Sequence, residues 1–156
     1  MLEPIFRPTR HGDLAATYAV RASTRDNPIP ETRLLEQGIT PETVWSGYMR
    51  GDYIGWVSEV GGEVIGFCTG DAATGEVLVL ALLPEHERKG IGARLLALVI
   101  KGMRAKGSPR LWLAASSDPR VRAHGFYRAK GWVPTGEILE NGDEILAFKA
   151  EEGWES

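Results

Sequence analysis

The stretch that decides the fold is Val77-Leu78-Val79-Leu80-Ala81-Leu82-Leu83-Pro84, followed after two residues by Glu87-Arg88-Lys89-Gly90-Ile91-Gly92. The apolar run that ends in proline predicts a strand buried on both faces, and therefore a central strand of a sheet. The two glycines predict a tight turn, and the apolar positions after it have helical spacing: Leu95, Leu96, Val99, Ile100 and Met103. A strand, a turn and a helix in this order direct the helix N-terminus and a row of backbone N–H groups at one point. Because such a point binds phosphate groups, the stretch predicts a phosphorylated cofactor.

The composition is typical of one globular domain. The chain has 156 residues, 25% of them charged, and a net charge of −3, whereas nucleic-acid binders usually have a basic footprint. No apolar run approaches the roughly 18 residues of a membrane span, and the N-terminus lacks the features of a signal peptide. Cys68 is the only cysteine, and no Cys/His pair has metal-ligand spacing. We therefore expect a cytoplasmic protein with no metal, no membrane span and no nucleic-acid partner, and we expect Cys68 to be a core residue.

The first third of the chain predicts a short strand and two helices. Ile5–Arg7 is expected to be the strand, and Asp13 is placed to cap a helix from Leu14 to about Arg25. A polar connection is expected next. Thr40-Pro41-Glu42 then has the cap, the proline and the acid of a helix start, and that helix should end near Arg50-Gly51.

The middle of the chain predicts a β-hairpin before the central strand. Residues 53–60 and 63–69 are rich in strand formers, and Gly61-Gly62 between them tolerates the positive φ of a two-residue turn.

The C-terminal third predicts a strand, a helix and a second hairpin. Residues 111–114 are a short apolar strand, and Asp118-Pro119 predicts the start of a helix that Gly131 ends. Two last strands, at residues 132–133 and 145–148, are joined through Asn141-Gly142. We therefore expect a single α/β domain over residues 1–150, with a mixed central sheet of about six to seven strands flanked by about four helices, and a loose tail over residues 151–156.

Two segments resemble a known enzyme superfamily. The strand, Pro84 and the Gly90-x-Gly92 turn resemble motif A of the GCN5-related N-acetyltransferases (GNAT). The segment Ala123-His124-Gly125-Phe126-Tyr127-Arg128-Ala129-Lys130-Gly131-Trp132 resembles motif B, with an alanine, an aromatic residue followed by tyrosine, and glycine plus an aromatic residue after three more. The order of the motifs and the early hairpin suit the superfamily, and the resemblance covers nearly the whole chain.

The resemblance implies an enzyme that binds acetyl-CoA and transfers its acetyl group to an amine of a small molecule or protein. By position, the backbone of Leu80, Ala81 and Leu82 would bind the pantetheine arm. The pyrophosphate would be held by the N–H groups of Arg88, Lys89, Gly90, Ile91, Gly92 and Ala93. Tyr127 would lie near the sulfur and protonate it as it leaves, because a phenol with a pKa near 10 has a proton to give at neutral pH.

Two residues depart from the superfamily pattern. Glu87 stands where Gln or Arg is usual, and a carboxylate beside a pyrophosphate is repulsive unless it points outward. Arg120 stands where many members carry Asn.

The acceptor and the general base are left open. Glu76, Glu59, His124 and Asp71 could each relay a proton through water, and water alone could suffice. Trp45 and Trp56 are candidates for lining an acceptor pocket. The acceptor would approach from the first two helices, residues 25–37 and the last hairpin, whose acids are compatible with a cationic amine although exposed loops are commonly acidic.

Two other classes of function compete with the enzyme. The fold could serve as a non-catalytic acyl-CoA-binding sensor or assembly module. The departure from the superfamily pattern at Glu87 is compatible with this alternative. A different nucleotide-binding fold ranks lowest, because no Gly-Lys-Ser/Thr follows the glycines and Leu95 replaces the third glycine of the dinucleotide fingerprint. Edge strands near the C-terminus could pair in a homodimer.

Overall fold

A seven-stranded mixed sheet organises the part of the chain that the computed structural model describes, residues 2–24, 28–108 and 110–148. Its order is β1-β2-β3-β4-β5-β7-β6, and within this part only β4 and β5 run parallel. The strands are β1 (Ile5–Pro8), β2 (Tyr53–Val60), β3 (Glu63–Asp71), β4 (Glu76–Leu82), β5 (Trp112–Ala115), β6 (Trp132–Ile138) and β7 (Glu144–Phe148). The helices are α1 (Leu14–Ala22), α2 (Glu31–Glu36), α3 (Pro41–Met49), α4 (Ile91–Ala105) and α5 (Arg122–Ala129), with 3₁₀ turns η1 (His11–Asp13) and η2 (Pro84–His86). The predicted α/β class with a mixed sheet is confirmed.

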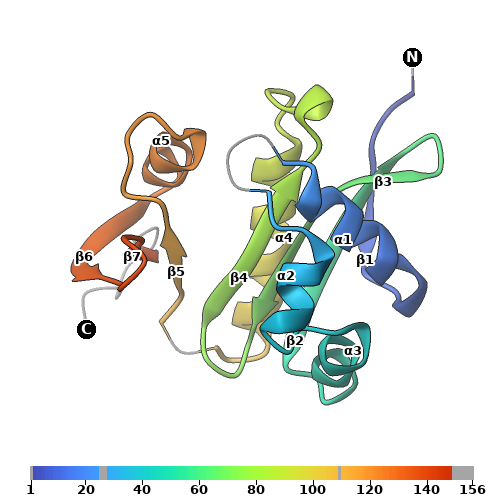
Figure 1. The fold of residues 1–156 in the computed structure, drawn as a ribbon, viewed down its shortest axis with the longest axis horizontal. Helices are drawn as coiled ribbons and strands as arrows, with labels where there is room; N and C mark the ends of the chain where they lie inside the picture. The colour runs from blue at the N-terminus through green and yellow to red at the C-terminus, as the bar shows by residue number, and fades with distance from the viewer. Residues whose placement is uncertain (1, 25–27, 109, 149–156) are drawn as a thin grey trace.

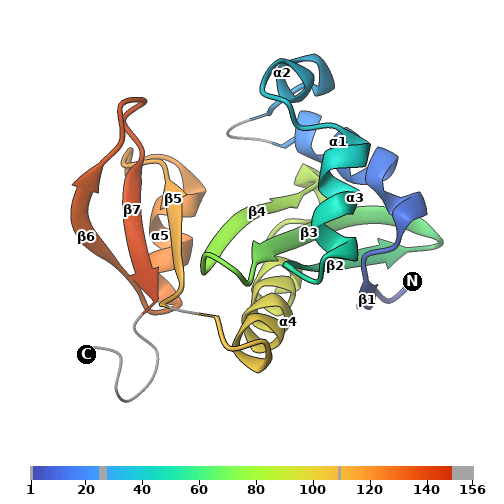
Figure 2. The same cartoon turned by 90° about the horizontal axis from the view of Figure 1, so that it is seen from below.

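Helices cover both faces of the sheet. Figure 2 shows α4 on one face and α1, α2 and α3 on the other. All five apolar positions predicted for α4 are buried, and they share one apolar cluster with Cys68, Tyr127 and Trp132. A smaller cluster on the α1 face contains Val20 and Phe67. The two clusters make β2, β3 and β4 the centre of the core.

Among the described residues, β4 and β5 pair at one position. Their one register pair is Glu76 with Trp112, the first residue of each strand. β5 pairs along its whole length with β7 instead, and Figure 1 shows β4 and β5 diverging from their common start. The edge of β4 that faces β5 therefore has no partner strand over most of its length within the described chain.

A β-bulge at Leu78 interrupts β4. Val77 pairs with Gly70 and Val79 pairs with Thr69, so Leu78 falls outside the register with β3. A bulge bends a strand and redirects its side chains, and Leu78 is 36% exposed. β4 is central in the sheet as predicted, but the prediction that it is buried on both faces is wrong, because part of one face lines a cavity.

The predicted helix caps at Asp13 and Asp118 are wrong, because each carboxylate forms an ion pair with an arginine. Asp13 accepts the Arg10 N–H at 2.7 Å and both Arg7 Nη atoms at 2.8 and 2.9 Å, and it makes no capping bond to α1. Asp118 accepts the N–H and the guanidinium of Arg120, and α5 begins only at Arg122.

Other local predictions have mixed outcomes. The Thr40 cap is confirmed, because its Oγ1 accepts the Thr43 N–H at 3.1 Å, and so is the turn in which Gly61 and Gly62 both have positive φ. The expected polar connection contains α2. The predicted tail, residues 151–156, lies outside the described residues.

The partly buried Arg7 network predicts an effect on stability. Arg7 bonds Asp13 and, at 2.9 Å, Glu59. Replacing Arg7 with Met removes both ion pairs while Asp13 keeps its bond from the Arg10 N–H, so the free energy of unfolding should fall by about 2 kcal/mol. The matched control is Arg50→Met, whose pair with Asp52 is largely exposed and should cost less than about 1 kcal/mol. Urea unfolding at pH 7 measures both.

The same network predicts how this stability changes with pH. The Arg7 guanidinium, more than any other group, holds the pKa of the Asp13 carboxyl below its usual range. A lowered folded pKa contributes stability above the unfolded value of about 3.9 and loses it as the pH falls through the folded pKa. The difference between wild type and Arg7→Met should therefore shrink below about pH 4. A difference that stays constant from pH 7 to pH 3 would contradict this role of Asp13.

Candidate active site

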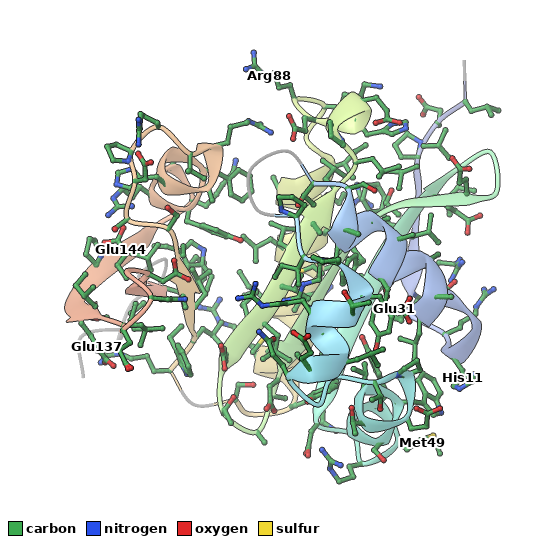
Figure 3. The ribbon with its side chains drawn as sticks, in the orientation of Figure 1. His11, Glu31, Met49, Arg88, Glu137 and Glu144 are labelled. Atoms are coloured by element: carbon green, nitrogen blue, oxygen red, sulfur yellow. The ribbon has the colours of Figure 1, made fainter. Side chains whose placement is uncertain are left out.

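A row of backbone N–H groups opens at the N-terminus of α4. Among the described residues, the N–H groups of residues 88–93 have no backbone acceptor. Arg88 (φ 65°) and Gly90 (φ 80°) have left-handed backbone conformations, and such residues turn successive N–H groups toward one side. Gly90 is the N-cap of α4 without a capping side chain, and Figure 3 shows the Arg88 side chain at the outer tip of the loop. The loop therefore has the geometry of an anion site.

Space for a ligand lies beside this row. Within the described chain, a Cβ built on Gly90 would meet no atom within 4 Å, and one built on Gly92 would meet only the Phe126 ring at 3.9 Å. Phe126 belongs to α5, so a side chain at position 92 would project into the space between α4 and α5.

Glu87 is held by a guanidinium from α5. Its Oε1 lies 3.0 Å from Nη1 of Arg122, and the Glu87 side chain is only 10% exposed. The ion pair joins the loop before α4 to the half of the molecule that carries β5, β6 and β7. The carboxylate that departs from the superfamily pattern is therefore charge-compensated in this structure.

The open edge of β4 presents free peptide groups. The Leu83 N–H donates to the Ile65 carbonyl of β3 at 2.9 Å. Peptide groups alternate in direction along an antiparallel ladder, so Ala81 also turns its N–H and C=O toward β3. Leu80 and Leu82 turn theirs toward β5, where no strand pairs with them in the described chain. Of the three predicted pantetheine-binding residues, these two have peptide groups available to a ligand.

Tyr127 extends from α5 into the core on the α4 face. It is 9% exposed and shares the apolar cluster with Cys68, against which Leu80 and Leu82 also pack. Its ring lies edge-to-face with the rings of Phe126 and Trp132, with ring centroids 5.2 and 6.1 Å apart. Burial raises the pKa of its hydroxyl, so this group stays protonated at neutral pH. Burial likewise raises the pKa of the Cys68 thiol, as expected for a core cysteine rather than a nucleophile.

A cavity of about 330 Å³ lies on the other face of the sheet. α1 contributes Tyr18 and Arg21, α3 contributes Tyr48, and β4 contributes Leu78 and Val79, at and beside the bulge. The cavity and the amide row therefore approach β4 from opposite faces. A ligand bound along the open edge of β4 could meet a second ligand in the cavity there.

The tryptophans and acids considered as acceptor or base residues lie elsewhere. Trp45 and Trp56 do not line the cavity; Trp45 packs against His11 and Tyr48 instead. The four candidate bases, Glu76, Glu59, His124 and Asp71, are absent from the described lining. Three of them have a partner: Glu59 lies 2.9 Å from Arg7, Asp71 accepts the Ala73 N–H at 2.9 Å, and His124 Nε2 lies 4.0 Å from Glu144 Oε2.

Sequence reasoning did not identify the α1 residues that line the cavity or the α5 arginine that pairs with Glu87. Tyr18 and Arg21 are three residues apart in α1, and Arg122 precedes motif B by one residue. Helical spacing places Tyr18 and Arg21 on one face, but the sequence does not show that this face lines a cavity. The motifs describe the cofactor side of such a site and contain no signal for the other side.

Comparison with known proteins identifies the family. A family model described as the acetyltransferase (GNAT) family matches residues 19–132. The chain belongs to the GNAT acetyltransferase family. A comparison with curated proteins finds no significant match.

Solved structures share the GNAT fold over nearly the whole chain. The PaiA N-acetyltransferase of Thermoplasma acidophilum, in complex with coenzyme A, has a TM-score of 0.77 and 21% identity, covering 95% of this chain and 99% of its own. The ribosomal-protein-S18-alanine N-acetyltransferase of Escherichia coli has a TM-score of 0.66 and 20% identity, covering 97% and 98%. At these identities the likeness shows the fold alone. Family membership makes this GNAT protein an acyltransferase in class.

The described residues contain neither a membrane-spanning helix nor a cluster of metal ligands. In the described ranges, no helix is long and apolar enough to cross a membrane. The same ranges contain no group of three or more His, Cys, Asp or Glu side chains that could hold a metal ion.

Proposed function

We propose that the chain is an acetyl-CoA-dependent N-acetyltransferase that moves the acetyl group directly to a primary amine. The observation that carries this proposal is the open edge of β4. The amide row and Tyr127 approach that edge from the α4 side, and the cavity approaches it from the α1 side. Two reactants can therefore meet at one strand. Holding them together in a reactive orientation can contribute roughly 7–11 kcal/mol toward the barrier.

The chain's residues fit coenzyme A. The N–H groups of residues 88–93 hold the diphosphate, and the peptide groups of Leu80 and Leu82 hydrogen-bond the pantetheine arm. When bound, acetyl-CoA supplies the acetyl group as a thioester. An N–H group at the open edge of β4 donates to the oxygen that becomes negative, and Tyr127 donates its proton to the departing sulfur.

No residue of the chain is assigned as a general base. The described lining of the cavity contains no carboxylate and no imidazole. The amine therefore loses its proton to water, and the fraction of neutral amine sets the rate at low pH. The non-catalytic module gains no support from Glu87, because Arg122 compensates its charge.

The experiment that tests the proposal measures release of the coenzyme A thiol from acetyl-CoA in the presence of a panel of amines. The panel contains amino acids, aminoalkyl phosphonates, polyamines, aminoglycosides and peptides with free N-termini. Amine-dependent thiol release, with an acetylated amine identified by mass spectrometry, supports the enzyme. Tight binding of acetyl-CoA without release in the presence of any amine would favour the non-catalytic module.

The Glu87 position predicts a change in cofactor affinity. Glu87→Gln removes a negative charge beside the amide row and keeps an acceptor for Arg122. We expect the Kd of coenzyme A to fall about 3-fold, which corresponds to the fraction of a kcal/mol typical of a partly exposed charge interaction. Calorimetry at low salt measures this change.

A second carboxylate in the same loop provides the control for Glu87. Glu85 is exposed on η2, and Glu85→Gln should change the Kd by less than the Glu87 variant, because exposed charges are screened. A weaker affinity in Glu87→Gln would show that the ion pair with Arg122 supports the loop more than its charge repels the diphosphate.

A further inference from the structure

The charge inside the cavity indicates the class of acceptor, an inference that rests on the proposed function. Arg21 is the only charged residue in the described lining. It lies in the last turn of α1, is half-buried, and pairs with no described carboxylate. Burial lowers the pKa of its guanidinium, although an arginine remains charged at neutral pH. Partial removal of a cation from water is costly unless an anion compensates its charge.

A second polar group in the same wall lacks a partner. The Tyr18 hydroxyl is buried and forms no hydrogen bond with the described residues. Buried polar groups are nearly always paired, and Tyr18 lies one helical turn before Arg21. The neighbouring hydroxyl of Tyr48 is already engaged by Thr69 Oγ1 at 3.1 Å. A guanidinium and a free phenol on one helix face form a donor pair suited to an anionic group.

The acids near the cavity do not occupy it. Burial raises the pKa of the Tyr18 hydroxyl, and Glu31 and Glu42 raise it further. Both carboxylates are exposed, however, and neither lines the cavity. Figure 3 shows Glu137 and Glu144 across the molecule, on the half formed by α5, β6 and β7, and Glu144 is paired with Arg128 at 2.7 Å. The acidic loops therefore do not make the cavity a cation site.

The size of the cavity favours a small acceptor. Its volume of about 330 Å³ is near the lower end of the range for small-ligand sites. Apolar side chains such as Leu14, Val44 and Phe67 complete its walls. Leu78 and Val79 place one part of the cavity at the bulge of β4, where the reaction would occur.

We infer that the acceptor is a small primary amine that also carries an anionic group, a carboxylate or a phosphonate, bound by Arg21 and Tyr18. The amine lies at the Leu78–Val79 end of the cavity and the anion lies against α1. An amino acid with an apolar side chain has all three features. A polyamine or an aminoglycoside would bring positive charge toward an uncompensated guanidinium.

The test compares matched amines by thiol release with acetyl-CoA. Each amino acid is paired with its amide, which keeps the amine and removes the charge, and aminoalkyl phosphonates form a second arm. Wild type should have a kcat/KM for the anionic member at least about 10-fold above that for the amide, because a hydrogen bond to a charged group is worth this much. Arg21→Gln should reduce that ratio to near one, and Arg21→Lys should restore part of it.

The control variant is Arg33→Gln, an exposed arginine on α2 that does not line the cavity, and it should leave the ratio unchanged. Thermal unfolding establishes that each variant folds. A merely structural Arg21 would lower activity toward both members equally and leave the ratio intact, which would overturn the inference. If Arg21→Gln lost the preference for the anionic amine only in the phosphonate arm, the inference would be supported and the anion would be a phosphonate.

A binding measurement separates this inference from the proposed function. Calorimetry with coenzyme A present should show binding of the anionic amine to wild type and at least about 10-fold weaker binding to Arg21→Gln. Such binding without acetyl transfer would support the anion site while the proposed enzyme fails. Acetyl transfer to amides or polyamines as fast as to anionic amines would support the proposed enzyme but overturn the inference. A lack of binding by every anionic amine would also overturn the inference.

Discussion

Replacing Tyr127 with Phe should lower kcat about 100-fold while leaving the Kd of coenzyme A nearly unchanged. The size is typical of the loss of a positioned general acid. The ring contacts with Phe126 and Trp132 are kept in the variant, so packing should be preserved. Thiol-release kinetics give kcat, and calorimetry gives Kd.

The pH profile distinguishes an acid from a packing residue. Because burial raises the pKa of Tyr127 above its ordinary value near 10, its proton is retained across the working range. Wild-type kcat/KM should rise with pH as the acceptor amine becomes neutral, with no fall up to about pH 9.5. If Tyr127→Phe kept the wild-type kcat throughout this range, Tyr127 would be a packing residue and the sulfur would leave without its proton.

Several elements could be predicted from the sequence because the interactions that form them are local. Apolar periodicity defines α4, whose five predicted positions are all buried. The Thr40 cap and the Gly61-Gly62 turn depend on residues within four positions of each other. In such cases the competing interactions are few, and local sequence decides the conformation.

The wrong caps show where local reasoning stops. Asp13 has the side chain and position of a cap, but the Arg7 guanidinium makes two charge-assisted bonds to it, and these are stronger than a bond to a helix N–H. Arg7 in turn is held by Glu59, 52 residues away. A sequence pattern contains no measure of such a distant partner.

The candidate site likewise has one part that local sequence predicts and another part that depends on distant elements. The sequence of residues 87–92 is sufficient to predict the amide row. The open edge of β4 instead depends on β5 pairing with β7, and 28 residues separate these two strands in the chain. The cavity needs α1, α3 and three strands to be in place, and Arg21 becomes significant only when no described carboxylate is found beside it. Motif reasoning therefore predicted residues for the cofactor side and left the acceptor side undetermined.

The second large effect is expected at Gly92. Gly92→Val should raise the Kd of coenzyme A about 100-fold, because a side chain there projects from the first turn of α4 toward Phe126. Displacing the diphosphate from two N–H groups would remove about 3 kcal/mol of charge-assisted hydrogen bonding, which corresponds to that change in Kd.

The fold should tolerate the Gly92 substitution, and this makes the binding result specific. Gly92 has no positive φ, and valine in a helix is no worse than glycine. The control is Ala97→Val, on the exposed surface of the same helix, which should leave both Tm and Kd close to wild type. A Gly92→Val protein that binds coenzyme A as tightly as wild type would show that the diphosphate lies away from this turn. Tyr127 would then lose its assigned place beside the sulfur, since both assignments depend on one ligand running from the N-terminus of α4 along the open edge of β4.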